Sequence, residues 1–97
     1  MRKKARVDAN QPAVVAALRK AGATVQSLAA AGDGVPDLLV AFRSDLFLLE
    51  VKDGSKPPSA RALTPDQVRW HAAWGAPVHV VNSVDEALQA IGAIHAV

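Results

Sequence analysis

The chain lacks several features that small proteins often use for stability or chemistry. Its 97 residues include no cysteine and no tyrosine, and only 4% are aromatic. The missing cysteine excludes a disulfide scaffold, a thiolate zinc site and a cysteine nucleophile, and it suits a reducing compartment. No apolar run approaches the ~20 residues needed to span a bilayer. We therefore expect a cytoplasmic protein that does not enter membranes.

The remaining composition is that of a small folded domain. Hydrophobic residues make up 51% of the chain, charged residues 21%, and the mean hydropathy is +0.14, which excludes intrinsic disorder. Twenty residues are alanine, however, and each buries little area. We expect one domain over residues 1–97, with a single core of two packed layers. Such a small core makes self-association plausible.

Charge is distributed unevenly although the net charge is only +2. A basic arm over residues 1–7 stands on a nearly neutral body, and it contains Arg2, Lys3, Lys4 and Arg6. An arm of this kind suits contacts with nucleic-acid phosphates, because each cation releases counterions, although the arm taken alone favours a solubilising terminus. Further candidates for phosphate contact, with solvated charge as the alternative, are Lys56, Arg61 and Arg69.

The pattern of apolar residues predicts an α/β sandwich around a mixed sheet, in the order α-β-β-β-α-β-α. The predicted segments are a helix over 8–21, strands over 23–28, 37–42 and 46–52, a helix over 65–74, a strand over 78–81 and a helix over 84–92. The second and third strands are nearly continuous apolar runs, which is typical of strands covered on both faces. The segment 53–62 contains glycine and two prolines and is expected to be an exposed loop.

Two helix starts carry recognisable capping signals. The first helix has two candidate starts, because Asp8 with Gln11 forms a capping-box pattern, whereas Pro12 as the first helical residue puts the boundary at Gln11. The helix over 65–74 begins with Thr64 as its N-cap and Gln67 at the capping-box position.

Three residues with ionisable side chains stand out in the middle of the chain. Glu50 and Lys52 are two apart on a predicted strand, so both side chains project from the same face. Asp37 opens the preceding strand. If a four-residue loop over 42–45 closes the hairpin, counting outward places Asp37 opposite Glu50, with Cβ atoms ~5 Å apart. We therefore expect two carboxylates and an ammonium at one end of an apolar sheet.

Two neighbouring carboxylates that are partly buried need a compensating charge. Asp37 and Glu50 would repel each other, and a divalent cation between them removes the conflict. Oxygen ligands suit Mg²⁺ or Mn²⁺, which polarises a phosphoryl oxygen and lowers the pKa of a bound water. Lys52 would then stabilise the developing charge. A cross-strand ion pair explains Lys52 and one carboxylate, but it leaves the second carboxylate unexplained.

The motifs around these residues resemble those of a known nuclease superfamily. The segments 34–40 (GVPDLLV), 48–52 (LLEVK) and 63–67 (LTPDQ) are similar to the PD-(D/E)XK nucleases, and more narrowly to the VRR-NUC branch with its minimal stand-alone members from phages and bacteria. The resemblance covers nearly the whole chain. It implies a restriction-endonuclease-like fold and a metal-dependent endonuclease that hydrolyses DNA.

The resemblance also assigns roles to individual residues. Asp37 and Glu50 would bind the metal together with the backbone carbonyl of Val51, and Lys52 would be the catalytic lysine. Gln67 matches the glutamine that this branch carries in the helix after the catalytic strand, and a purely capping role fits it equally well.

The chain departs from the family in its first helix, where an acidic residue often helps to hold metal or water. The corresponding stretch has no glutamate, and its candidate oxygen ligands, directly or through water, are Asp8, Asn10 and Gln11. This departure bears on metal affinity more than on the reaction class. Together with the modest basic charge, it motivates an alternative function, a nucleic-acid-binding or assembly module with weak or no catalysis.

The resemblance further implies a homodimer that acts on branched DNA such as Holliday junctions. The apolar tail over 91–97 is a candidate dimer surface. Trp70 and Trp74 share one helical stripe, which favours core packing or a dimer contact over base stacking. A core or surface role is favoured for His71, which follows Gln67 by four residues and could also face the site.

Overall fold

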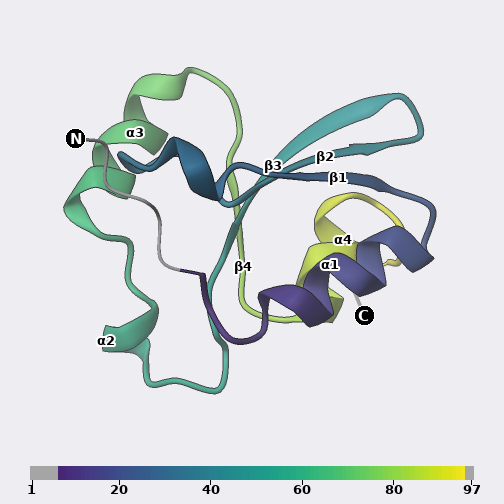
Figure 1. Ribbon diagram of the computed structural model, residues 1–97, viewed down its shortest axis with the longest axis horizontal. Coiled ribbons are helices and arrows are strands. Elements are labelled where there is room, and N and C mark those ends of the chain that lie inside the picture. Colours follow the sequence, from purple (N-terminus) through teal and green to yellow (C-terminus); the bar gives the residue numbers. More distant parts are fainter. Residues whose placement is uncertain (1–6, 96–97) are drawn as a thin grey trace.

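The computed structural model describes residues 7–95 and shows a small α/β fold with a four-stranded mixed sheet. The predicted order of elements is confirmed, with two additions, the 3-10 helix η1 and the short helix α2 inside the expected loop. Figure 1 shows α1 (Gln11–Lys20), β1 (Thr24–Ser27), η1 (Ala29–Ala31), β2 (Leu38–Phe42), β3 (Asp45–Val51), α2 (Pro58–Arg61), α3 (Pro65–Trp74), β4 (His79–Val81) and α4 (Val84–Ala90). The basic residues Arg2, Lys3, Lys4 and Arg6 lie outside the described residues.

The sheet has the strand order β1-β2-β3-β4. Strands β1, β2 and β3 pair antiparallel with one another in turn, and β4 pairs parallel with β3. The predicted register of the β2–β3 hairpin is confirmed, because Leu38 pairs with Leu49. One step further along this register, Asp37 lies opposite Glu50, as the sequence predicted.

The turn of this hairpin is shorter than expected. The predicted loop over 42–45 is wrong, because Phe42 still pairs with Asp45 and only Arg43 and Ser44 form the turn. Both turn residues have positive φ, 50° and 70°. Two such residues make a type I′ turn, whose twist matches that of the hairpin, so the register survives although the loop loses two residues.

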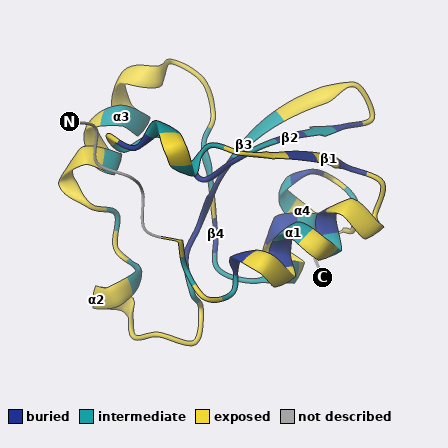
Figure 2. Ribbon diagram, in the orientation of Figure 1, coloured by how far each residue is buried: buried dark blue, intermediate teal, exposed yellow. Residues whose placement is uncertain are grey.

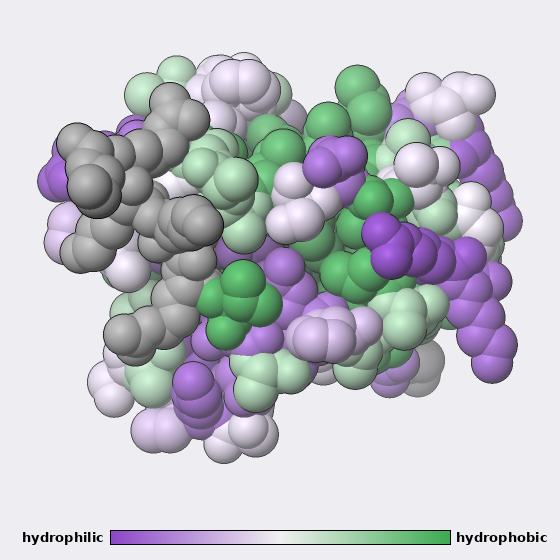
Figure 3. Space-filling model, viewed as in Figure 1, coloured by the Kyte–Doolittle hydropathy of each residue, from purple (hydrophilic) through white to green (hydrophobic). Residues whose placement is uncertain are grey.

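One face of the sheet carries the hydrophobic core and is closed by α1 and α4, which lie side by side in Figure 1. Side chains along β2 alternate between buried and half-buried, as a pleated strand requires. Figure 2 shows the buried residues along the strands and the inner sides of these helices, and on the face seen in Figure 3 hydrophobic residues gather centrally. The core contains Val14, Leu18, Ala23, Val25, Leu38, Val40, Phe42, Leu49, Val51, Val81, Ala87 and Ile91.

The opposite face is covered only in part, by α3, so the expectation that β2 and β3 are covered on both faces is only half met. Leu46 of β3 is 72% exposed there. An apolar groove of about 580 Å³ lies between this face and α3, and the rings of Trp70 and Trp74 stack along it at 4.6 Å. Because Trp74 is half exposed, core packing is the wrong role for this pair.

The ends of α1 follow one of the two predicted patterns. The helix starts at Gln11 with Asn10 as its N-cap and Pro12 in its first turn, so the capping box from Asp8 does not form. At the other end Gly22 has a φ of 103°, and its N–H donates to the Arg19 carbonyl, as in a glycine-terminated helix.

The predicted dimer surface at 91–97 needs correction. Ile91 is a core residue with 4% exposure, whereas Ile94 is 37% exposed, and residues 96 and 97 lie outside the described part of the chain. The described tail is therefore no continuous apolar patch. Within residues 7–95, none of the helices has the length and apolar character needed to cross a membrane.

Candidate active site

The structure brings Asp37, Glu50 and Lys52 together at the carboxyl end of β3. Their exposed fractions are only 4%, 1% and 8%. Asp37 Oδ2 accepts a hydrogen bond from the Val51 N–H at 2.7 Å, and the Asp37 and Glu50 side chains are hydrogen-bonded to each other. The predicted convergence of two carboxylates and an amine is confirmed, and the roles of these residues remain predictions.

Glu50 is strongly perturbed by this environment. The pKa of Glu50 rises from 4.5 to about 9, mainly because burial disfavours the charged form, and further because the Asp37 carboxylate hydrogen-bonds to it and repels it. The positive charge of Lys52 acts in the opposite direction. In the protein alone Glu50 is therefore protonated at neutral pH. Ionising both carboxylates requires more positive charge than Lys52 supplies.

Gln67 performs both of the roles that the sequence left open. Its Oε1 accepts from the Thr64 N–H at 2.9 Å, and its own N–H donates to Thr64 Oγ1 at 3.2 Å, which completes the capping box of α3. The same Oε1 accepts from Lys52 Nζ at 2.8 Å, and Nε2 donates to Glu50 Oε2 at 3.3 Å. One amide thus fixes the start of a helix and two side chains of the site.

A glycine lets α3 approach the beginning of β2 closely enough for these contacts. Gly34 has a φ of 85°, and a Cβ atom at this position would lie 2.3 Å from the Asp66 carbonyl oxygen. Any larger residue would combine backbone strain with a clash against the first turn of α3. The glycine-containing loop before Asp37 is therefore part of what places Gln67 over the site.

His71 also reaches the site, although the sequence favoured a core or surface role for it. Its Nε2 lies 3.3 Å from Glu50 Oε1, and its side chain is 13% exposed. Burial lowers the pKa of His71, the charge of Lys52 lowers it further, and Asp37 acts in the opposite direction. The neutral ring can donate to the Glu50 carboxylate or accept from its carboxyl group.

The backbone carbonyl of Val51 fits the predicted role of a metal ligand. Continued by two residues beyond Leu38, the hairpin register places Pro36 opposite Val51. In such a pair each residue normally donates its N–H to the other's carbonyl, but proline has no N–H. The Val51 N–H bonds to the Asp37 carboxylate instead, and Pro36 supplies no donor for the Val51 carbonyl.

The stretch before α1 lies beside the site. The charge of Asp8 contributes to the raised pKa of Glu50, and Asn10 Nδ2 donates to the Lys52 carbonyl at 2.9 Å. Gln11 is 5% exposed. Within residues 7–95, neither Asn10 Oδ1 nor Gln11 Oε1 has a hydrogen-bond partner, although both atoms are buried. The roles of Asp8, Asn10 and Gln11 as oxygen ligands stay predictions, because in the described part of the chain no contact joins their oxygens to the carboxyl groups of Asp37 and Glu50 except through the charge of Asp8.

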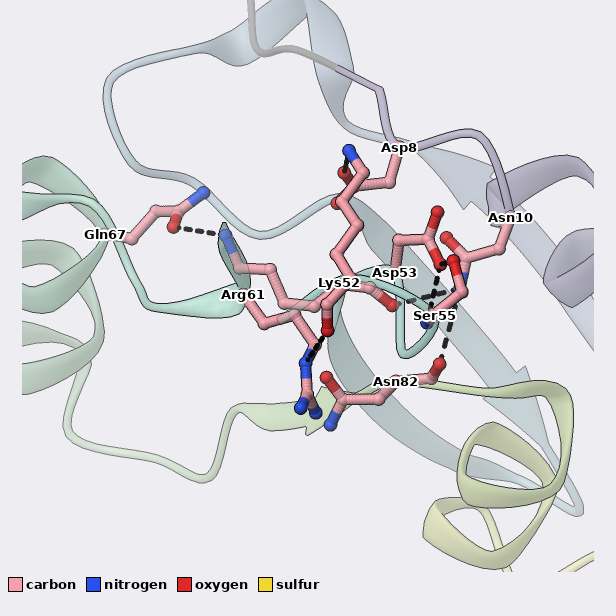
Figure 4. Close-up of polar contacts among 9 residues, drawn as sticks. Asp8, Asn10, Lys52, Asp53, Ser55, Arg61, Gln67 and Asn82 are labelled. Carbon is pink, nitrogen blue, oxygen red and sulfur yellow. Dashed lines mark hydrogen bonds and ion pairs between the residues drawn. The ribbon is translucent and has the colours of Figure 1, made fainter. Parts of the chain in front are cut away.

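Two of the three predicted phosphate contacts, Lys56 and Arg61, contact each other in the segment after β3, and the third lies on α3. Lys56 Nζ is 3.7 Å from Asp8 Oδ1, and Arg61 Nε donates to the Lys56 carbonyl at 2.8 Å (Figure 4). Arg69 lies on the exposed side of α3 and pairs with Asp66. Figure 4 also shows Lys52 reaching toward Gln67, with Asn10 on its other side.

The side chains that could hold a metal here are two carboxylates. Among the described residues there is no cluster of three or more histidine, aspartate or glutamate side chains placed to share an ion. Two carboxylates plus one carbonyl still suit Mg²⁺, which keeps several waters in its coordination shell. Comparisons with protein-family models, curated proteins and solved structures find no match to this chain.

Proposed function

We propose that this protein is a divalent-metal-dependent endonuclease that hydrolyses phosphodiester bonds in DNA, with the restriction-endonuclease-like topology of the VRR-NUC branch of PD-(D/E)XK nucleases. The observation that carries the proposal is the contact of two buried carboxylates, Asp37 and Glu50, beside the buried ammonium of Lys52. An ordinary structural ion pair needs one carboxylate, and the second one raises the pKa of Glu50.

Mg²⁺ or Mn²⁺ would be held by Asp37, Glu50 and the Val51 carbonyl, with waters completing the coordination. When bound, the ion supplies charge that polarises a phosphoryl oxygen and lowers the pKa of a coordinated water. The buried, hydrogen-bonded position of Asp37 and the protonated state of Glu50 support this assignment, because a doubly positive ion removes the conflict between the two carboxylates.

The chain's own residues do the remaining work. Lys52 presents a fixed ammonium, whose hydrogen bond to Gln67 leaves donors free for a phosphate oxygen or an attacking water. Gln67 orients both Lys52 and Glu50, and His71 holds the other oxygen of Glu50. These hydrogen bonds with Gln67 and His71 hold the side chains of Lys52 and Glu50 within the narrow range of positions that catalysis needs.

One observation favours the alternative of a nucleic-acid-binding or assembly module with weak or no catalysis. In place of an acidic residue, the start of α1 offers only the uncharged amides of Asn10 and Gln11. Asp8 partly compensates, because its charge reaches Glu50. Metal binding separates the two functions, since the module predicts no Mn²⁺ site.

A homodimer acting on branched DNA is the finer part of the proposal. The surface we assign to the dimer contact is the apolar groove beside α3, because Leu46 and Trp74 are exposed there and the described residues that line the groove include no aspartate, glutamate, lysine or arginine. Light scattering of wild type and Leu46→Glu tests it: a dimer that becomes a monomer supports the assignment, and an unchanged mass contradicts it.

The nuclease itself is tested by cleavage of flap, duplex and four-way-junction DNA with added Mn²⁺. Lys52→Ala should lower the rate at least ~100-fold, as the loss of a transition-state donor does. Lys20→Ala is the matched control, since Lys20 is an exposed lysine at the end of α1. Equal activity of Lys52→Ala and wild type would refute the role of Lys52. Calorimetry should show a Mn²⁺ site that Asp37→Ala removes.

A further inference from the structure

The segment before α1 and the segment after β3 contact each other at the edge of the site. Asn10 Nδ2 donates to the Lys52 carbonyl at 2.9 Å, and two residues earlier in the chain Asp8 Oδ1 lies 3.7 Å from Lys56 Nζ. Figure 4 shows Asp8 and Asn10 on the side of Lys52 that faces away from Gln67. A hydrogen bond and an ion pair therefore join two segments that are more than forty residues apart in the sequence.

The backbone of the segment after β3 is held at several points. The Gly54 N–H donates to the Asn82 carbonyl at 3.0 Å, and a Cβ atom on Gly54 would lie 2.6 Å from that oxygen. The Lys56 N–H donates to the Asp53 carbonyl at 3.1 Å, and the Lys56 carbonyl accepts from Arg61 Nε at 2.8 Å. Because the backbone of Lys56 is held in this way, its ammonium can change partners by a change of side-chain rotamer alone.

Asp8 acts on two groups of opposite charge. Its side chain is 21% exposed and pairs with Lys56, while its backbone carbonyl accepts from the Gln11 N–H at 3.0 Å. Its charge also reaches the buried carboxyl pair: burial is the main cause of the raised pKa of Glu50, Asp37 adds to it, and Asp8 adds further. Asp8 is therefore an acidic group beside the candidate metal site whose ion-pair partner in the free protein is a lysine.

The ion pair of Asp8 and Lys56 is weak enough to be exchanged. The Lys56 side chain is 48% exposed, and pairs so open to water shift an equilibrium by about fivefold at most. Asp53 accepts hydrogen bonds from the Ser55 N–H and hydroxyl instead, and within residues 7–95 it forms no ion pair with Lys56. A divalent ion beside Glu50 attracts the Asp8 carboxylate more strongly than an exposed ammonium does, because its charge is twice as large.

We propose that Asp8 is shared between Lys56 and the metal site, so that metal binding draws its carboxylate away and releases the ammonium of Lys56 for a phosphate of the DNA backbone. The inference rests on the proposed nuclease function. Until metal binds, Asp8 keeps Lys56 from the DNA. By linkage the exchange also works in the other direction, so a phosphate that takes Lys56 leaves Asp8 to the metal site and tightens metal binding by the same factor. The protein would then hold DNA most firmly when its metal is in place.

The pairing of Lys56 with Asp8 is tested by DNA binding without metal, so that no cleavage occurs. Fluorescence anisotropy of a labelled flap oligonucleotide in EDTA, over a series of salt concentrations, gives the affinity and its salt dependence. Asp8→Asn should tighten binding about two- to fivefold and steepen the plot of log affinity against log salt by about 0.9, the contribution of one phosphate contact. Adding Lys56→Ala to Asp8→Asn should return the slope to the wild-type value.

A matched variant controls for the loss of a negative charge. Asp45→Asn makes the same change at an exposed residue at the other end of β3 and should leave the slope unchanged. An unchanged slope in Asp8→Asn overturns the proposal. A slope change that Asp45→Asn reproduces, or that persists after Lys56→Ala, overturns it too, because Lys56 would then not be the released group.

Calorimetry with Mn²⁺ alone tests the other half of the exchange. Lys56→Ala leaves Asp8 without its partner and should tighten Mn²⁺ binding about two- to fivefold, whereas Lys20→Ala, at an exposed lysine of α1, should not. Asp8→Asn should weaken Mn²⁺ binding more in the Lys56→Ala background than in wild type, because only in wild type must the ion pair be broken first. Equal weakening in both backgrounds would mean that the two charges act independently, and it overturns the sharing.

These measurements separate the inference from the proposed function. If the wild-type protein binds Mn²⁺ and cuts DNA while Asp8→Asn has equal effects in both backgrounds, the nuclease stands and the shared role of Asp8 is wrong. A wild-type protein that binds no Mn²⁺ refutes the nuclease and the exchange with it.

Discussion

Helices α1 and α4 close one face of the sheet with apolar side chains, whereas the opposite face holds buried ionisable groups at one end and an exposed apolar groove at the other. On the closed face Leu18, Leu38 and Leu49 are fully buried. On the open face Glu50 is as buried as they are, yet it carries a carboxyl group. Burial stabilises the first face and is a cost on the second, where it perturbs the chemistry of Glu50.

The residues that stabilise the fold therefore lie on the closed face, and the residues of the candidate site lie on the open face. The two sets alternate along the same strand, since Leu49 and Val51 point to the core and Glu50 points to α3. A one-residue slip of β3 would exchange them and destroy both faces at once. The register of the β2–β3 hairpin therefore determines stability and site together.

The largest contrast is expected between two leucines of β3. Leu49→Ala removes a fully buried side chain from the closed face and should lower the free energy of unfolding by about 2–5 kcal/mol. Leu46→Ala changes a side chain that is 72% exposed and should cost less than about 1 kcal/mol. Urea unfolding of both variants measures the difference. Similar losses would show that the open face is also part of the core.

The pH dependence of stability should reveal the unusual carboxyl group of the open face. The pKa of Glu50 is 4.5 when unfolded and about 9 when folded, so between these values the folded state holds a proton that the unfolded state has lost. Stability should therefore fall as the pH rises from about 5 to about 9, by up to about 1.4 kcal/mol per pH unit. Glu50→Gln should flatten this slope in thermal melts. A melting temperature of the wild-type protein that stays constant over this pH range would contradict the burial of Glu50.

The double role of Gln67 can be divided by comparing two variants of the same cap. Thr64→Ala and Gln67→Ala each disrupt the capping box of α3 and should each cost about 1 kcal/mol of stability. Only Gln67→Ala also removes the hydrogen bonds to Lys52 and Glu50. We therefore expect DNA cleavage to fall much further in Gln67→Ala than in Thr64→Ala. If the two variants have equal stability and equal DNA cleavage rates, Gln67 acts only as part of the helix cap.

The smallest effect is expected for the ion pair on the outer side of α3. Arg69 and Asp66 have side chains that are 70% and 59% exposed. Exposed pairs contribute little, so Arg69→Gln should change the free energy of unfolding by less than about 0.5 kcal/mol. Chemical unfolding at low and high salt checks this. A larger change would indicate that α3 depends on surface charge rather than on its contacts with the site.

The centre of the site could be predicted because local rules determine it. The pleat places Glu50 and Lys52 on one face, and the hairpin register places Asp37 opposite Glu50. The error in the loop was harmless, since the turn lost one residue from each side and the pairing did not move. The capping of α3 was predictable for the same reason, because Thr64 and Gln67 are only three residues apart.

The surroundings of the site depend on packing between distant segments, which no local pattern encodes. His71 contacts Glu50 across 21 residues of sequence, and Asn10 contacts Lys52 across 42 residues. The coverage of the open face was overestimated for the same reason. An apolar run shows that a strand can be buried on both faces, but not that a partner exists for each.

The amide of Gln67 ties the first turn of α3 to the ammonium of Lys52, so the two cannot come apart independently. Helix ends open far more readily than whole proteins. A brief fraying of this turn would break the hydrogen bonds that join Gln67 to Lys52 and Glu50 while the closed face stays intact. The first turn of α3 would then control whether these two side chains are held in place. Any substrate that engages Lys52 should accordingly slow hydrogen exchange at the amide of Gln67.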